Sequence, residues 1–321
     1  MRVLFMGTPD FACPALDGLV KAGVTVIGVF TQADRPKGRG QALTSPPVKQ
    51  AALAHHLPVF QPTGLSHEAV GATWADLNPD AVVVVAYGFI LPPWILHGPP
   101  MGCINLHASL LPRHRGAAPI NWAVIRGDEE TGVTTMLMDE GMDTGPILMQ
   151  ESIPITPEDT AGTIHDRLSL VGADLVVKTL DGYRQGIVIP RKQPDEGATM
   201  APKLDREIGR LDWTRDAVSL WNLIRGINPH PGAFTFLHGR MIKIWYSRPV
   251  EGDAGNAEPG MITDVDPRQG VIVQAGKGRI ALLEVQPENK KKMSAQSFLS
   301  GYREQLIGEV FTRFGGTGDA R

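Results

Sequence analysis

The pattern of apolar and polar residues over the first 190 positions predicts alternating strands and helices. Short apolar runs at 2–7, 24–30, 80–88 and 102–107 are typical of buried strands, and apolar residues at helical spacing lie between them. The run at 80–88, DAVVVVAYG, is continuously apolar, as in strands covered on both faces of a parallel sheet. This alternation predicts an α/β fold with a Rossmann-like, doubly wound and mostly parallel sheet.

The pattern changes after residue 190. Residues 190–206 have the proline-, glycine- and charge-rich composition of a linker. A helix is predicted over 214–226, and five short strands separated by turn residues then predict a small OB-like β-barrel. We therefore expect a first domain over 1–189, a linker over 190–206, a barrel domain over 207–314 and a flexible tail over 315–321.

Composition narrows the class of protein. The chain of 321 residues is 42% hydrophobic and 20% charged, which favours an ordinary globular protein with a sizeable core. Its longest apolar run is interrupted at Tyr87 and Gly88 and by two prolines, so it is not expected to span a membrane. Cys13 and Cys103 lie in apolar surroundings and show no metal-ligand spacing. We expect a cytoplasmic monomer with reduced thiols and no metal.

The charge is unevenly distributed. Residues 1–190 contain 12 basic and 18 acidic side chains, whereas the remainder contains 19 basic and 16 acidic ones. The mildly basic second part permits contact with a phosphate backbone without requiring it.

Several common motifs are absent from the sequence. The turn after the first strand reads GTPDF, so the G-x-G-x-x-G fingerprint of dinucleotide sites is missing. Neither a G-x-x-x-x-G-K-[ST] loop nor a G-x-S-x-G elbow occurs. These absences argue against a dinucleotide cofactor, a nucleoside triphosphate and serine hydrolysis.

Polar residues at one strand end suggest chemistry. Asn105 and His107 are two positions apart on the strand at 102–107, so their side chains project to the same side. An amide beside an imidazole can stabilise a developing oxyanion and exchange protons. Asp143, in the loop MDEGMDTG, is the candidate carboxylate partner for the imidazole. We expect the strand exits carrying these residues and AYGFILP to face one crevice.

The motifs GCINLHASLLPRHRGAAP and TGVTTMLMDEGMDTG together resemble the signature of the folate-dependent formyltransferases. The stretches FMGTPDFACPAL, GVFTQADRPKGRG, VVVVAYGFILP and LDWTRDAVSLWNLIRGINPHPGAFT resemble the branch that acts on initiator methionyl-tRNA. The resemblance covers nearly the whole chain. It implies transfer of a formyl group from 10-formyltetrahydrofolate to the α-amino group of methionine on initiator tRNA, without a metal.

The resemblance also implies roles for individual residues. The family's catalytic residues correspond to Asn105, His107 and Asp143 in this chain. The folate site corresponds to the segment after the strand at 102–107 and to the apolar residues around position 90. Its residues are Ser109, Leu110, Leu111, Pro112, Phe89, Ile90 and Leu91.

For tRNA, the resemblance points to the loop over 33–44, which we expect to insert at the acceptor end. Many relatives carry lysines where this chain has Gln41 and Ala42, so the loop's charge rests on three other residues. The candidate tRNA contacts are Arg35, Lys37 and Arg39 in this loop, and Lys203, Arg206, Lys290, Lys291 and Lys292 beyond it.

Three alternatives remain open at the level of the sequence. A formyltransferase acting on an amino sugar or on glycinamide ribonucleotide, and a formyl-folate hydrolase, would share Asn105, His107 and Asp143. A non-catalytic RNA-binding protein would rely on the barrel alone. The second domain and the loop over 33–44 favour tRNA, and the intact catalytic set favours an enzyme.

Overall fold

The computed structural model describes residues 1–37, 42–252, 255–266, 268–301 and 306–314. It contains two compact units. The predicted boundaries differ from these units, because residues 190–202 belong to the first and not to a free linker. The first unit comprises Met1–Pro119, Glu130–Pro154 and His165–Pro202, and the second comprises Ile120–Glu129, Ile155–Ile164 and the described residues from Lys203 onward. The predicted tail at 315–321 lies outside the described residues.

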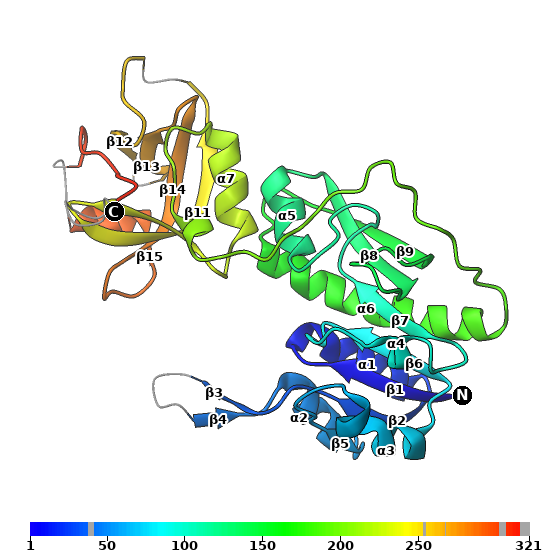
Figure 1. Cartoon of the computed structure of the whole chain (residues 1–321). Coiled ribbons are helices and arrows are strands. Elements are labelled where there is room, and N and C mark those ends of the chain that lie inside the picture. The colour runs from blue at the N-terminus through cyan, green and yellow to red at the C-terminus, as the bar shows by residue number, and fades with distance from the viewer. Residues whose placement is uncertain (38–41, 253–254, 267, 302–305, 315–321) are drawn as a thin grey trace. The chain divides into compact units, whose positions relative to one another are not determined.

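A seven-stranded sheet forms the centre of the first unit (Figure 1). Its first five strands in spatial order are parallel, which confirms the predicted doubly wound, mostly parallel α/β fold. The last two strands run antiparallel to their neighbours, and the last of all was not expected from the sequence. The order is β5 (Val59–Phe60), β2 (Thr25–Phe30), β1 (Arg2–Gly7), β6 (Ala81–Val85), β7 (Cys103–His107), β8 (Glu130–Leu137) and β9 (Ile147–Pro154).

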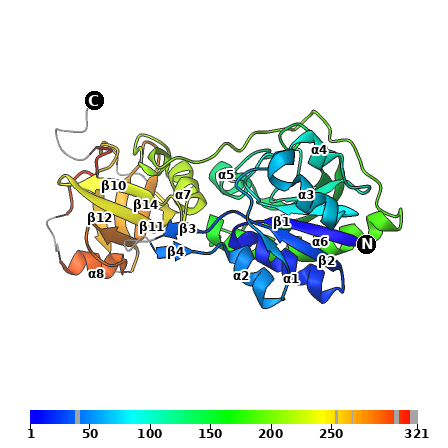
Figure 2. The same ribbon diagram turned by 60° about the horizontal axis from the view of Figure 1, so that its bottom comes forward.

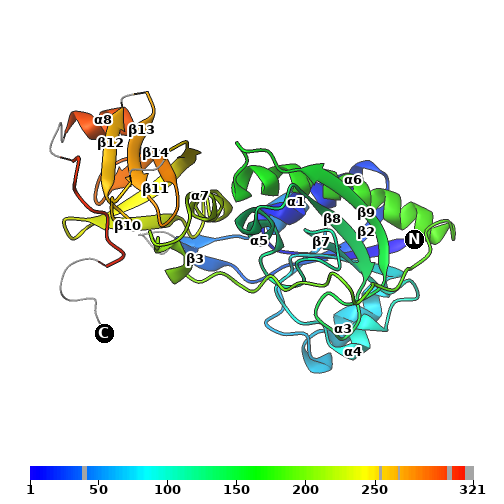
Figure 3. The same cartoon turned by 90° about the horizontal axis from the view of Figure 1, so that it is seen from above.

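Helices cover both faces of this sheet, as Figure 3 shows. On one face, α3 (His67–Leu77) and α4 (Pro93–Leu96) pack with Val84 and Cys103 in an apolar cluster. On the other face lie α1 (Cys13–Lys21), preceded by the short η1 (Asp10–Ala12), and α6 (Ala161–Arg184). The hydroxyl groups of Thr135 on β8 and Thr179 on α6 are 2.8 Å apart. Alongside α1 lies α2 (Pro47–Ala54).

A hairpin occupies part of the segment that the sequence predicts as a polar loop. It pairs β3 (Arg35–Lys37) with β4 (Ala42–Thr44). At its base, Lys49 Nζ lies 2.9 Å from both carboxylate oxygens of Asp34 and 2.8 Å from Gln61 Oε1. The hydrogen bond from Lys49, followed by that from Gln61, lowers the pKa of Asp34. This polar network fixes the base of the hairpin to α2.

The second unit is a small antiparallel barrel, as expected (Figure 2). Residues 308–312 connect its two edge strands, because Thr312 bridges to Phe236 and Val310 bridges to Met261. No strand was predicted for this closing segment. The spatial order is β10 (Ala233–Leu237), β11 (Arg240–Val250), β14 (Arg279–Pro287), β13 (Gly270–Gln274) and β12 (Ile262–Asp266), with β15 (Met293–Ser294) paired to β14.

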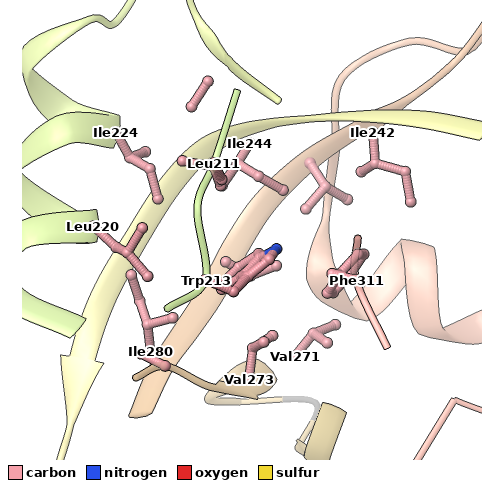
Figure 4. Close-up of a cluster of buried hydrophobic side chains, with 14 of the residues drawn as sticks. Leu211, Trp213, Leu220, Ile224, Ile242, Ile244, Val271, Val273, Ile280 and Phe311 are labelled. Atoms are coloured by element: carbon pink, nitrogen blue, oxygen red, sulfur yellow. The ribbon is translucent and has the colours of Figure 1, made fainter. Parts of the chain in front are cut away.

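The helical parts of the second unit are α5 (Pro119–Arg126, from residue 120), η2 (Glu207–Gly209), α7 (Ala217–Gly226) and α8 (Ala295–Ser300). Packing of α7 on β11 and β14 encloses the core shown in Figure 4. Trp213 stacks on Phe311 with ring centroids 5.7 Å apart. Its indole N–H donates to Thr235 Oγ1 at 3.0 Å, so the ring is buried with its polar group satisfied.

Two smaller features bear on the sequence expectations. Both cysteines are free thiols, and burial raises the pKa of Cys103 to about 12. Within the described part of the chain, no helix is both long and apolar enough to cross a bilayer.

Replacing Leu220 tests the barrel core. Its side chain is fully buried in the α7 face, so Leu220→Ala should lower the free energy of unfolding by about 2–5 kcal/mol. Val218 lies on the same helix but is 51% exposed, so Val218→Ala should change it by less than about 0.5 kcal/mol. Urea denaturation followed by tryptophan fluorescence would measure both. Equal effects of the two substitutions would contradict the described packing.

Candidate functional site

His107 ends β7 and is 7% exposed. Its Nε2 lies 3.0 Å from the carbonyl oxygen of His114. A carbonyl oxygen only accepts, so this contact places a proton on Nε2. The other ring nitrogen, Nδ1, faces Asp143 Oδ2 at 3.6 Å, which is an ion-pair distance but long for a hydrogen bond.

Asn105 lies on the same strand face as His107, two residues earlier. Its side chain is half-buried and makes no hydrogen bond to any other residue that the structure describes. The amide is therefore available to a ligand, whereas the His107 ring is held on both sides.

Asp143 reaches His107 by a route that the sequence did not predict. Since β8 is antiparallel to β7, Leu137 pairs with Ile104, and the following loop starts at the end of the sheet away from His107. The loop must therefore turn back toward His107, because the Asp143 carboxylate lies 3.6 Å from His107 Nδ1. Asp143 does lie in the loop after β8, the neighbour of β7. The expectation that this strand exit lies at the same end of the sheet as that of β7 assumed parallel strands, whereas β8 is antiparallel.

The returning loop is tightly folded around Asp143. This residue has a φ of 54°, in the left-handed region that is costly for a residue other than glycine. Its Oδ2 accepts a hydrogen bond from the backbone N–H of Gly116 at 2.8 Å. A Cβ atom on Gly145 would overlap the carbonyl oxygen of Leu137, so the close approach requires glycine there.

The segment over 109–112 is fixed to the sheet by Thr134 of β8. The Thr134 hydroxyl donates to the carbonyl oxygen of Ser109 at 2.6 Å and accepts from the Leu111 N–H at 3.1 Å. Gln150 on β9 donates to the Leu111 carbonyl oxygen at 2.9 Å. Ser109 is fully buried and its own hydroxyl donates to the Arg113 carbonyl oxygen. Ser109 and Leu111 therefore shape the segment, and Leu110 and Pro112 are its half-buried members.

The residues over 89–91 follow β6, the parallel neighbour of β7. Leu91 is buried and Phe89 packs against Tyr87, with ring centroids 5.3 Å apart. Ile90 is 95% exposed, which leaves an apolar side chain free for a ligand. Burial raises the pKa of the Tyr87 hydroxyl, so this group stays neutral.

A strap formed by residues 190–202 covers the loop after β7. Its backbone pairs with Ile147 through Arg191 and with Arg115 through Thr199 and Ala201. The Thr199 hydroxyl accepts from the His114 N–H at 2.8 Å. Sequence reasoning missed this role, because the strap has no apolar periodicity and these hydrogen bonds join residues 44 to 86 positions apart.

The predicted tRNA contacts are basic residues on both units. Arg35 is exposed on β3, Lys37 contributes its backbone to the same strand, and Arg39 lies outside the described residues. Lys203, Arg206 and the lysines over 290–292 are exposed.

Lys292 differs from its two neighbours in the lysine run. Its Nζ pairs with Glu284 at 2.9 Å and lies about 5 Å from the ring centres of Trp245 and Tyr246. Lys292 is thus already held by an acid and two aromatic rings.

Together, these side chains suit acyl-type chemistry. An amide without a partner can donate to a developing oxyanion, and the bare Nδ1 of neutral His107 can accept a proton beside a carboxylate. Among the described residues, no group of three or more histidine, cysteine, aspartate or glutamate side chains is arranged to hold a metal.

Comparisons with solved structures give the same fold. An N-formyltransferase from Helicobacter canadensis, in complex with folinic acid and dTDP-3-aminofucose, aligns with a TM-score of 0.65 at 16% identity, over 90% of this chain and 100% of its own. HypX from Aquifex aeolicus, in complex with tetrahydrofolic acid, aligns with a TM-score of 0.60 at 15% identity. That alignment covers 96% of this chain, which spans about half the length of HypX.

Sequence comparisons give the family. The methionyl-tRNA formyltransferase of Pelotomaculum thermopropionicum is 50% identical over 94% of this chain and 96% of its own, and that of Geobacter sulfurreducens is 48% identical over 94% of each. Residues 1–180 match the formyl transferase model, and residues 203–303 match the model of the formyl transferase C-terminal domain. The chain belongs to the formyl transferase family.

Proposed function

We propose that this protein transfers a formyl group from 10-formyltetrahydrofolate to the α-amino group of methionine on initiator methionyl-tRNA. The similarity to methionyl-tRNA formyltransferases over both units carries the proposal. The geometry of Asn105, His107 and Asp143 supports it, because amine formylation needs an oxyanion donor and a proton acceptor close together.

In the reaction, the amine nitrogen bonds to the formyl carbon, whose oxygen gains negative charge. The Asn105 amide donates to this oxygen, and His107 donates to it only while Nδ1 is protonated. Neutral His107 accepts the amine proton at Nδ1, and Asp143 stabilises the resulting imidazolium. His107 then returns the proton to N10 of the folate as the bond between the formyl carbon and N10 breaks.

The first unit binds the folate, and basic residues of both units contact the tRNA. The folate binds the first unit, against the backbone of the 109–112 segment and the side chains over 89–91. The tRNA contacts the basic residues of the second unit and the segment over 33–44, whose sequence includes Arg39. We place this activity in the cytoplasm and expect a monomer.

The first prediction concerns the catalytic set. Asn105→Ala should lower kcat by about 100–1000-fold, because it removes an oxyanion donor. His107→Ala and Asp143→Ala should also lower kcat strongly, and all three variants should keep tRNA affinity within about threefold, since they remove reaction-specific contacts.

Formylation should be measured with initiator methionyl-tRNA, elongator methionyl-tRNA, an amino sugar nucleotide and no acceptor. Preferential formylation of the initiator species supports the proposed acceptor. Turnover of the amino sugar instead, or release of formate without an acceptor, would identify one of the alternatives. Near-normal turnover by His107→Ala would reject its proposed role.

A second prediction separates two buried threonines of β8. Thr134→Val removes the hydroxyl that fixes the 109–112 segment, so it should raise the KM for the folate and destabilise the protein by about 1–3 kcal/mol. Thr131 is 3% exposed, and its hydroxyl has no hydrogen-bond partner among the described residues. Thr131→Val should therefore leave KM unchanged and cost little stability. Folate titration and thermal denaturation of both variants would show whether only the first matters.

A third prediction compares the three lysines of the barrel. Lys290→Ala and Lys291→Ala should each reduce the magnitude of the slope of log affinity against log salt concentration by up to about 0.9. This is the value for one lost phosphate contact on duplex DNA. Lys292→Ala should change the slope less, because Glu284 already pairs with Lys292. Filter binding to initiator tRNA between low and moderate salt gives the slopes. If Lys292→Ala had the largest effect, Lys292 and not Lys290 or Lys291 would be the main phosphate contact, and this prediction would be wrong.

A further inference from the structure

Gln193 is a polar residue buried in the strap, with a side chain only 3% exposed. Its amide nitrogen donates to the carbonyl oxygens of Asp143 and Gly145, each at 2.8 Å. Its amide oxygen accepts from Nε and Nη2 of Arg115, at 3.1 and 2.7 Å. Both hydrogens of the amide and both lone pairs of its oxygen are therefore used.

The orientation of this amide is unambiguous. The Arg115 guanidinium can only donate, and the two backbone carbonyl oxygens can only accept. Exchanging the amide oxygen and nitrogen would place donor against donor and acceptor against acceptor. The three partners thus require a glutamine at position 193, and a glutamate or methionine cannot reproduce the contacts.

Gln193 joins the two loops that meet at the site. One contact reaches the backbone of Asp143, the residue in the left-handed conformation, and the other reaches Arg115 beside Gly116. The Gly116 N–H is the group that holds the Asp143 carboxylate, at 2.8 Å from Oδ2. Gln193 therefore constrains both the loop that supplies the Gly116 N–H and the loop that supplies the Asp143 carboxylate. In this way it holds the carboxylate 3.6 Å from His107 Nδ1.

We propose that Gln193 is a positioning residue for formyl transfer, holding Asp143 against His107 by clasping the loops over 138–145 and 109–118. The proposal rests on the catalytic role given above to Asp143. Among the described residues, Gln193 bonds neither His107 nor Asn105, so it acts through Asp143 and not on the substrate.

The strap itself does not depend on this side chain. Arg191, Thr199 and Ala201 attach it through backbone hydrogen bonds of 2.7–3.3 Å. Removing the Gln193 amide should leave the strap in place while freeing the Asp143 loop. A purely structural role would instead predict a general loss of stability without a specific change at Asp143.

The test uses Gln193→Met, which keeps the length of the side chain without its hydrogen bonds, and Gln193→Glu, which keeps an acceptor for Arg115 but removes the donor. The matched control is Gln185→Met, because Gln185 is exposed and its side chain bonds only Asp181 among the described residues. Each substitution at 193 is also made in an Asp143→Ala background. The readouts are kcat and KM for both substrates, and hydrogen exchange of the Gly116 N–H.

Both substitutions at 193 should lower kcat by roughly 10–100-fold with little change in KM, as expected for a catalytic group displaced by about 1 Å. In the Asp143→Ala background they should add less than about twofold, because coupled sites are not additive. Exchange of the Gly116 N–H should become faster with Gln193→Met and not with Gln185→Met.

Two outcomes would overturn the inference. One is that the substitutions at Gln193 lower kcat by the same factor in the wild-type and the Asp143→Ala backgrounds, which would indicate a role unrelated to Asp143. The other is unchanged exchange of the Gly116 N–H in Gln193→Met. The exchange measurement needs no turnover, so it decides whether Gln193 holds the Asp143 loop even if the full chain fails to formylate methionyl-tRNA and the proposed function is rejected.

Discussion

The reversal of chain direction between β7 and β8 is the constraint on which the site depends. His107 ends β7 at one edge of the sheet, whereas the loop after β8 starts at the opposite end. To bring a carboxylate to His107, the chain must turn back toward that end of the sheet. That return requires a left-handed residue at Asp143 and a close approach that only Gly145 permits. A loop with these costs needs attachments that hold it in place.

Three sets of contacts hold the loops around His107, and the third of them reaches the Asp143 loop. Thr134 and Gln150 fix the segment after His107 to the sheet, and the strap over 190–202 covers the next residues with backbone pairing. The Gln193 amide then links the strap to the Asp143 loop. Asn105 is the exception, because its amide has no partner among the described residues. This contrast suits catalysis, because the Asn105 amide can donate to the developing oxyanion while the groups around it are held in place.

The barrel achieves order by a different route. Its sheet has two edge strands, and residues 308–312 join them, so neither edge is left open along this stretch. Within it, Lys292 is balanced by Glu284 while Lys290 and Lys291 are exposed. A run of three lysines in the sequence is therefore not one uniform surface. Among the described residues, Lys292 has a carboxylate partner, whereas Lys290 and Lys291 have none.

The sequence by itself determined the main strands, the doubly wound class and the shared side of Asn105 and His107, because periodicity reports burial and face directly. It also carried the family resemblance. Only the tertiary structure decided that β8 and β9 each run antiparallel to the preceding strand. It also decided that residues 308–312 close the barrel and that residues 190–202, which have the composition of a linker, form a strap. Periodicity encodes whether a residue is buried, but neither the direction of a strand nor its partner far along the chain. Gln193 shows the limit most clearly, since a polar residue in a polar stretch becomes buried only when Arg115 and Asp143 are brought to it.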